Sequence, residues 1–396
     1  MKEHVGCASA HRHRLALADR CAEAHPAIFL RLICLLLLAS VAVAAEPAKD
    51  FAAYQGGGPL LGQAPAFPAP PYKLRWTYRT DETDRVSVDA SPVVSGQTAY
   101  VADAAGTLHA IDLATGKARW TCKTENGFAT TPLVMDGKVI LGDLVGLVHA
   151  VAADTGKALW KFDSEAGIHS SANAAGNSIL FGNDANQILC LDAGTGKLLW
   201  KAEAGDRVNS TLSIADGLAF SSGCDSHLRA IDIATGKEKF AADLGNIAPG
   251  AAALIGGNAI IGTDGGRLVC MNIDPPKQAW VYEGVENQAM VYATPAIADG
   301  IIVAGARDRQ IHAIDLKTGQ KKWAFRTRGD VNASPLISDG RVFIPSRDKK
   351  LYVLDLKTGD KLWEFQAGRA IEAGVAIGGG VLILADTAGN VYCLEP

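Results

Sequence analysis

Three oxygen-bearing side chains, Asp89, Asn332 and Glu372, are of the types that could bind a hard cation together. Carboxylate and amide oxygens are the ligands that Ca²⁺ prefers in proteins. The three residues lie far apart along the chain, so they form a site only if the fold brings them to one place. A metal site made from them is therefore a hypothesis about the fold. The alternative is that they are polar side chains lining a wet channel.

The spacing of the tryptophans predicts that fold. From Trp120 onward, the steps between successive large aromatic residues are 40, 40, 40, 40, 43 and 40, with Phe240 at the one position that lacks a tryptophan. A fixed period of about 40 residues is typical of a repeat array in which each unit is one blade of a β-propeller. The predicted docking positions are Trp76, Trp120, Trp160, Trp200, Phe240, Trp280, Trp323 and Trp363.

Each repeat reads as four short strands separated by turns. In residues 87–120, apolar runs alternate with turn residues such as Gly96 and the segment Thr115-Gly116-Lys117. Eight such units can be counted, but the last ends before its fourth strand, and a strand with Trp76 precedes the first unit. We therefore predict an all-β fold, an eight-bladed β-propeller over residues 74–396. The N-terminal strand closes the ring by completing the last blade.

The segment before the propeller divides into two parts. Basic residues, an apolar run over 32–45 and small residues at 43–45 predict a signal peptide over residues 1–45. The protein is then periplasmic or otherwise exported, and the alternative is an uncleaved signal that anchors it to the inner membrane. Residues 46–73 are rich in proline and glycine and are expected to be a linker, loosely packed or disordered.

Charge and cysteine content exclude some classes of function. The formal net charge of −4 gives no reason to expect a nucleic-acid partner. After residue 45 the chain has an odd number of cysteines and no CxxC pair, which is not the pattern of a disulfide framework. Cys190, Cys270 and Cys393 occupy positions where other repeats carry alanine, so we expect small buried side chains there.

Aligning the repeats places one residue per blade at the mouth of the axial channel, just before each innermost strand. We call this set the mouth ring, and its polar members are the candidate ligand site. The metal hypothesis uses Asp89, Asn332 and Glu372, which come from adjoining blades once the ring closes. The mouth ring is Asp89, Ala129, His169, Asn209, Pro249, Tyr292, Asn332 and Glu372.

A second candidate site is a basic surface on the loops of blades six to eight. These loops share one face with an insertion of three residues near 285–290, and insertions in repeat proteins tend to mark the binding face. Such a cluster could attract an acidic partner, although Asp308, Asp330 and Asp348 are interleaved and could pair with it locally. The surface comprises Arg307, Arg309, Arg326, Arg328, Arg347, Lys349, Lys350 and Arg369.

The element Ala-x-Asp-x-x-Thr-Gly-Lys-x-x-Trp, found at 110–120 and, except for Gln320, at 313–323, resembles the tryptophan-docking motif of the PQQ-like repeat β-propellers. That superfamily includes quinoprotein alcohol dehydrogenases, which bind pyrroloquinoline quinone (PQQ) and Ca²⁺ in the funnel. It also includes BamB-like propellers, which are non-catalytic. The resemblance to dehydrogenases is weakened because there is no adjacent cysteine pair, no haem-attachment motif and no tryptophan outside the docking ladder.

The expected function is therefore that of an exported, non-catalytic scaffold that binds a protein partner, as BamB-like propellers do in envelope protein assembly. No cofactor is expected in this interpretation, and any membrane association would come through a partner or an uncleaved signal. One alternative is a PQQ-dependent and Ca²⁺-dependent dehydrogenase-like oxidoreductase, or a relict of one, that uses the channel mouth. Another is a propeller that binds a small ligand or glycan at the same mouth.

Overall fold

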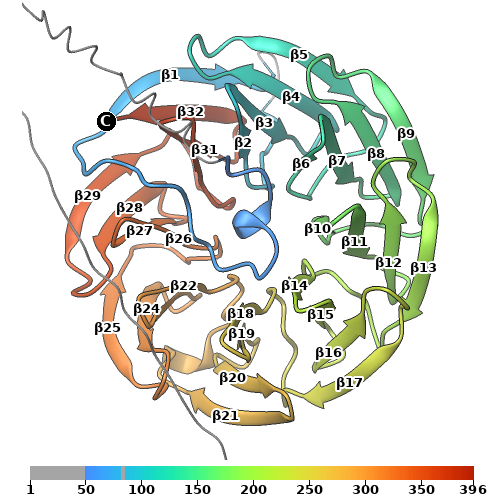
Figure 1. Cartoon of the computed structure of the whole chain (residues 1–396). Coiled ribbons are helices and arrows are strands. Elements are labelled where there is room, and N and C mark those ends of the chain that lie inside the picture. Colours follow the sequence, from blue (N-terminus) through green and yellow to red (C-terminus); the bar gives the residue numbers. More distant parts are fainter. Residues whose placement is uncertain (1–49, 82–84) are drawn as a thin grey trace, which may run out of the picture. The chain divides into compact units, whose positions relative to one another are not determined.

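The computed structural model describes residues 50–81 and 85–396, which form eight four-stranded antiparallel sheets around a central axis (Figure 1). Seven blades use consecutive strands, and the eighth joins both ends of the chain in the order β1-β32-β31-β30. The predicted fold class and the closure by the N-terminal strand are confirmed. The predicted signal segment lies outside the described residues. Within those residues, no helix is long and apolar enough to cross a membrane.

The first four blades have the following strands. Blade 1 contains β2 (Val93–Ser95), β3 (Thr98–Ala102), β4 (Thr107–Asp112) and β5 (Ala118–Lys123). Blade 2 contains β6 (Leu133–Met135), β7 (Lys138–Gly142), β8 (Leu147–Ala152) and β9 (Ala158–Asp163). Blade 3 contains β10 (Asn173–Ala175), β11 (Ser178–Gly182), β12 (Gln187–Asp192) and β13 (Leu198–Glu203). Blade 4 contains β14 (Ser213–Ala215), β15 (Leu218–Ser222), β16 (His227–Asp232) and β17 (Glu238–Asp243).

The other four blades follow the same plan. Blade 5 contains β18 (Ala253–Ile255), β19 (Asn258–Gly262), β20 (Leu268–Ile273) and β21 (Pro276–Tyr282). Blade 6 contains β22 (Ala296–Ala298), β23 (Ile301–Gly305), β24 (Gln310–Asp315) and β25 (Lys321–Arg326). Blade 7 contains β26 (Leu336–Ser338), β27 (Arg341–Pro345), β28 (Lys350–Asp355) and β29 (Lys361–Gln366). Blade 8 contains β30 (Ala376–Gly378), β31 (Val381–Ala385), β32 (Asn390–Glu395) and β1 (Lys73–Arg79), and two 3₁₀ turns, η1 (Tyr54–Gly56) and η2 (Glu286–Gln288), lie outside the blades.

The tryptophans dock each blade onto the next one. The Trp160 indole Nε1 lies 3.2 Å from the carbonyl oxygen of Ala193 in the following blade, and its ring covers Gly196 in the same turn. Five other tryptophans make the same carbonyl hydrogen bond and cover the equivalent glycine. The glycine is needed because it adopts a positive φ and because a Cβ atom would collide with the indole.

The two docking positions that depart from this pattern each face a turn without the glycine. Phe240 precedes blade 5, whose outer turn contains Pro275 instead of the Thr-Gly-Lys sequence, and Phe240 packs against Phe220. Trp363 precedes blade 8, where the corresponding turn is interrupted by the two ends of the propeller. The Tyr72 ring packs edge-on against Trp363 there, with the ring centroids 5.0 Å apart.

Residues 50–72, here called the N-terminal strap, run around the inner edges of the blades (blue in Figure 1). A strap carbonyl accepts the backbone N–H from the middle residue of the innermost strand in blades 1, 2, 4, 5, 6 and 7, at 2.7–2.9 Å. In blade 3, the Asn173 side chain makes two hydrogen bonds with the backbone of Gly58 instead. These N–H groups lie on a strand edge with no neighbouring strand, so the strap supplies the partners that the sheets lack.

The expectation of a loosely packed or disordered linker is therefore wrong for residues 50–72. The prolines and glycines suit this path because the strap must turn repeatedly within a narrow space. Gly62 adopts a φ of +62°, and a Cβ atom there would lie 2.3 Å from the Gln55 side chain. The strap also adds to the core, where Phe67 is buried among Tyr72 and Phe343.

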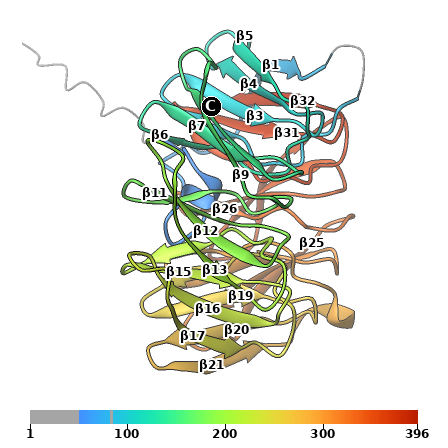
Figure 2. The same cartoon turned by 90° about the vertical axis from the view of Figure 1, so that its right-hand side faces the viewer.

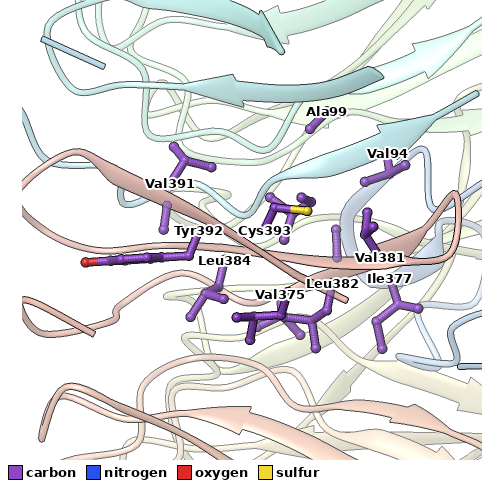
Figure 3. Close-up of a cluster of buried hydrophobic side chains, with 14 of the residues drawn as sticks. Val94, Ala99, Val375, Ile377, Val381, Leu382, Leu384, Val391, Tyr392 and Cys393 are labelled. Carbon is purple, nitrogen blue, oxygen red and sulfur yellow. The ribbon is translucent and has the colours of Figure 1, made fainter. Parts of the chain in front are cut away.

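Apolar side chains fill the space between adjacent blades. The largest buried cluster lies where the ring closes: Val94 and Ala99 of blade 1 belong to the same cluster as Val381, Leu382 and Cys393 of blade 8 (Figure 3). Cys190, Cys270 and Cys393 are free and buried, as expected from their positions in the repeats. The closing strand β1 therefore joins a continuous core.

Buried carboxylates hold the loops between the second and third strands. The Asp308 carboxylate lies 2.9 Å from His312 Nε2, and the Tyr282 hydroxyl lies 3.0 Å from Nδ1 of the same histidine. Asp103 and His109 repeat this arrangement with Tyr78. Burial raises the pKa of Asp308, but the hydrogen bond and charge of His312 and two backbone N–H groups outweigh it, so the pKa is below its usual value.

We predict that Gly196→Ala destabilises the propeller more than Gly217→Ala does. Both glycines have a φ above +70°. A Cβ atom at position 196 would lie 2.4 Å from the Trp160 ring, whereas a Cβ atom at position 217 would have no described atom outside its own chain neighbours within 4 Å. The backbone cost of about 1–2 kcal/mol is shared. Collision with the indole adds about 1–3 kcal/mol only at 196. Equilibrium denaturation of both variants measures the difference, and equal losses would contradict the docking role of the glycine.

The carboxylate networks predict acid sensitivity. A native pKa below the unfolded value stabilises the protein above the unfolded pKa of about 4, and this contribution is lost as the pH falls through the native pKa. Asp308→Asn should lower the free energy of unfolding at pH 7 by about 1–3 kcal/mol. The difference in free energy of unfolding between this variant and the wild type should become smaller below about pH 4. Urea denaturation across this pH range tests it, and a gap that does not change with pH would contradict it.

Candidate functional site

All eight residues of the mouth ring line one cavity on the propeller axis, with a volume of about 150 Å³. Each lies just before the innermost strand of its blade, so the repeat brings eight distant positions to one ring. Tyr54 of the strap also lines this cavity. Its hydroxyl lies 2.9 Å from both Thr294 Oγ1 and Ser334 Oγ. The strap thus reaches the cavity from the side of the inner hairpin turns and forms its floor.

A layer of hydroxyl side chains lies two residues beyond the mouth ring. Several of these hydroxyls accept a backbone N–H from the preceding blade: Thr294 N donates to Ser334 Oγ at 2.9 Å, and Thr131 N donates to Ser171 Oγ at the same distance. Gly374 N donates to Ser91 Oγ across the closure at 3.0 Å. Sequence reasoning missed this layer, although serine or threonine at 91, 131, 171, 211, 294 and 334 was a readable signal. Tyr54 gave no such signal because it lies outside the repeats.

On one side of the mouth, polar side chains form a continuous chain from blade 6 to blade 8. Arg307 lies over the Tyr292 ring, 5.6 Å from its centroid, and its Nε donates to Asn332 Oδ1 at 3.1 Å. The Asn332 amide donates to Glu372 Oε2 at 3.0 Å. Arg347 Nε lies 2.7 Å from Glu372 Oε1. The ring residues of blades 7 and 8 are therefore each bonded to an arginine from the blade before.

The other polar members of the mouth ring have separate partners. Asp89 accepts a hydrogen bond from Ser87 at 2.5 Å. His169 is exposed to solvent, with Nε2 3.6 Å from Asp184 Oδ2. The side-chain oxygen of Asn209 is buried and has no hydrogen-bond donor among residues 50–81 and 85–396. The mouth is thus uneven: arginines of blades 6 and 7 bond to ring residues on one side, and the buried Asn209 oxygen on blade 4 lacks a donor in the described residues.

These contacts do not fit PQQ and Ca²⁺. The oxygens of Asn332 and Glu372 already bond to guanidinium groups, which would repel a cation placed between them. In the described part of the chain, no group of three or more His, Cys, Asp and Glu side chains could hold a metal ion. The cavity of about 150 Å³ is also smaller than the roughly 300–1,000 Å³ of typical cofactor pockets. The site supports no reaction step through that cofactor.

The predicted basic surface divides into two kinds of residue. Arg326 pairs with Glu286 at 2.9 Å, Lys350 pairs with Glu364, and Arg307 and Arg347 take part in the mouth contacts. The remaining four side chains are exposed and make no ion pair with any residue in 50–81 or 85–396. They are Arg309, Arg328, Lys349 and Arg369.

Two of the interleaved carboxylates do not neutralise these four side chains by direct pairing. Asp308 turns inward to His312, and Asp348 accepts from the Tyr352 hydroxyl at 2.6 Å. The inserted residues form η2, which packs on the same face because Gly266 leaves room for the backbone of Gln288 (Figure 2). The basic loops and the insertion therefore lie on the face opposite the strap, with their charged groups exposed.

We predict that Tyr54→Phe lowers the free energy of unfolding by about 1–3 kcal/mol, because Thr294 and Ser334 lose a buried partner. Tyr54→Ala should cost more, about 3–5 kcal/mol, since it also removes the ring that forms the cavity floor. Denaturation of both variants measures these losses. The control is Tyr100→Phe. It removes a tyrosine hydroxyl that donates to the Ala153 carbonyl at a place away from the axis, so it gives the loss of stability for a hydroxyl outside the cavity. Wild-type stability in Tyr54→Ala would show that the strap does not hold the floor.

Comparison with solved structures shows a shared fold. BamB from Moraxella catarrhalis matches with a TM-score of 0.71 at 15% identity, covering 82% of this chain and 100% of that one. The quinohemoprotein alcohol dehydrogenase from Comamonas testosteroni matches with a TM-score of 0.73 at 14% identity, covering 87% and 80%. The computationally designed Ika8 protein matches with a TM-score of 0.71 at 20% identity, covering 81% and 99%. No curated protein sequence matches.

Likeness at these identities establishes the architecture alone, since BamB, an alcohol dehydrogenase and a designed protein all match with TM-scores of 0.71–0.73. The comparison with family models is more specific. The model described as outer membrane protein assembly factor BamB matches residues 66–143, 145–290 and 284–396, which is nearly the whole propeller. The chain therefore belongs to this BamB family of PQQ-like repeat β-propellers.

Proposed function

We propose that this chain is an exported, non-catalytic propeller that binds a protein partner through the loop face of blades 6–8, as a scaffold in envelope protein assembly. The observation that carries the proposal is the set of exposed basic side chains Arg309, Arg328, Lys349 and Arg369 beside the insertion. They lie on a protein whose net charge is negative. An acidic partner would be steered to this sector, because complementary charge speeds encounter and selects the partner.

Two further features support a binding role over catalysis. The cavity on the axis is small and its floor is closed by Tyr54. The carboxylate and amide that would hold Ca²⁺ in the alternative interpretation are bonded to Arg347 and Arg307. The family model names an outer membrane protein assembly factor, and the export signal predicted over residues 1–45 agrees with that role.

A photo-crosslinking residue at position 309 should trap a discrete partner in cells, whereas one at Lys157, on the opposite face, should not. The triple variant Arg309→Glu, Arg328→Glu and Arg369→Glu should reduce capture about tenfold by charge repulsion, measured through a crosslinker at Lys349. The matched control reverses Lys117, Lys157 and Lys197, which lie in the outer turns opposite. No adduct on the loop face, or equal losses in the two triple variants, would overturn the proposed surface.

Thermal unfolding with EDTA, with Ca²⁺, and with Ca²⁺ plus PQQ tests the enzymatic alternative. A ligand at about 100 times its Kd would stabilise the protein by roughly 2.7 kcal/mol. We expect the unfolding midpoint to stay the same in all three conditions, because the oxygens of Asn332 and Glu372 are already bonded. A shift that needs both additions would favour a quinoprotein and would be followed by alcohol-oxidation assays.

A further inference from the structure

A second ring of equivalent positions lies just outside the mouth ring. In every blade, the second residue after the second strand donates its backbone N–H to the carbonyl two residues before the mouth-ring residue of the same blade. This contact fixes eight side chains around the mouth, and we call them the loop ring. They are Ala104, Leu144, Asp184, Cys224, Asp264, Arg307, Arg347 and Thr387.

The loop ring is strongly polarised. Arg307 and Arg347 stand side by side on blades 6 and 7, whereas Asp184 and Asp264 stand on blades 3 and 5. In a ring of eight, blades four steps apart face each other, so Asp184 lies across the mouth from Arg347. A guest between blades 7 and 3 therefore meets the Arg347 guanidinium on one side and the Asp184 carboxylate on the other, whereas Asp264 adjoins Arg307.

Each side has unused hydrogen-bonding capacity. Arg307 bonds to Asn332 through Nε, and Arg347 approaches Glu372 through Nε, so no terminal amino group of either has a hydrogen bond within residues 50–81 and 85–396. Across the mouth, Asn209 Oδ1 and Asp184 Oδ1 are buried without a donor in the same part of the chain. A buried acceptor without a donor costs free energy, which a ligand that donates there would recover.

The cavity limits the guest to a chain end. It is blind, because Tyr54 forms its floor, so an extended polypeptide cannot thread through it. Its volume of about 150 Å³ has room for about five water molecules, which suits one terminal residue. Apolar side chains also flank the mouth: Val145 is 55% exposed and Tyr292 is 47% exposed, with Leu144 and Ile247 also exposed. They could contact the residues that precede the terminus.

We infer that this mouth binds the C-terminal carboxylate of a partner polypeptide. The carboxylate lies against the terminal amino groups of Arg307 and Arg347, and the last backbone N–H groups donate to Asn209 and Asp184. Apolar residues before the terminus pack on Leu144, Val145 and Tyr292. The cation–π contact between Arg307 and Tyr292 holds the guanidinium in place before binding. This inference rests on the proposed protein-binding function and names the part of the partner that is recognised.

The test uses fluorescein-labelled peptides Gly-Ser-Ala-Val-X, with X as Ala, Leu, Phe, Glu or Lys, each as a free carboxylate and as an amide. We expect at least one free carboxylate to bind the protein, and its amide to bind about tenfold more weakly or not at all. Arg307→Gln with Arg347→Gln should remove this preference. The control, Lys117→Gln with Lys157→Gln, changes exposed basic side chains of the outer turns on the opposite face and should retain it. The unfolding midpoint verifies that each variant is folded.

Three results would overturn the inference. They are no binding by any peptide up to about 1 mM, equal binding of carboxylate and amide, or a preference that survives in Arg307→Gln with Arg347→Gln. Binding of free leucine is measured as well. If free leucine binds as tightly as the peptides, the site is one for small molecules and the inference is overturned. The proposed function is tested separately: if crosslinking at 309 succeeds while the peptides fail, the scaffold role stands and the carboxylate site falls.

Discussion

Every sheet in this protein has two edges whose backbone groups need partners, and the structure depends on how those edges are covered. At the closure, β1 pairs with β32 and completes the eighth blade, so neither end of the propeller leaves a three-stranded sheet. At the axis, the innermost strands have no neighbour on one side, and carbonyl groups of the N-terminal strap accept hydrogen bonds from their N–H groups. Unpaired edges would cost hydrogen bonds and invite pairing with other chains.

The N-terminal strap, which covers the inner strand edges, also shapes the candidate site. Because the strap fills the end of the channel next to the inner hairpin turns, the channel becomes a blind cavity with a single polar mouth. Tyr54 is part of the strap and also part of the cavity floor, so the stability of the ring and the shape of the site share one residue. The loop face remains free for a partner, and it is the face that carries the insertion and the exposed arginines.

The eight blades share one backbone arrangement, but they carry different side chains at equivalent loop positions. The second loop residue after the second strand is alanine in blade 1, leucine in blade 2, aspartate in blades 3 and 5, and arginine in blades 6 and 7. The backbone hydrogen bond that holds this residue is the same in all eight blades. A uniform scaffold thus places different side chains at matched points around one mouth, which lets charge vary around the ring without altering the fold.

The sequence by itself determined the number of blades, their four-stranded form and the closure by the first strand. A period of about 40 residues, docking aromatics and turn glycines are local signals that repeat eight times, so errors in one unit are corrected by the others. The sequence also identified the mouth ring, because equivalent residues of the repeats lie at the same level along the propeller axis.

Only the tertiary structure decided what the non-repeating residues do. The strap has no periodicity, and its proline and glycine content suits a linker as well as a packed strap, so its role depends on backbone edges contributed by distant blades. The arginine contacts to Asn332 and Glu372 join loops and strands from different blades, and side-chain reach between blades cannot be read from spacing along the chain.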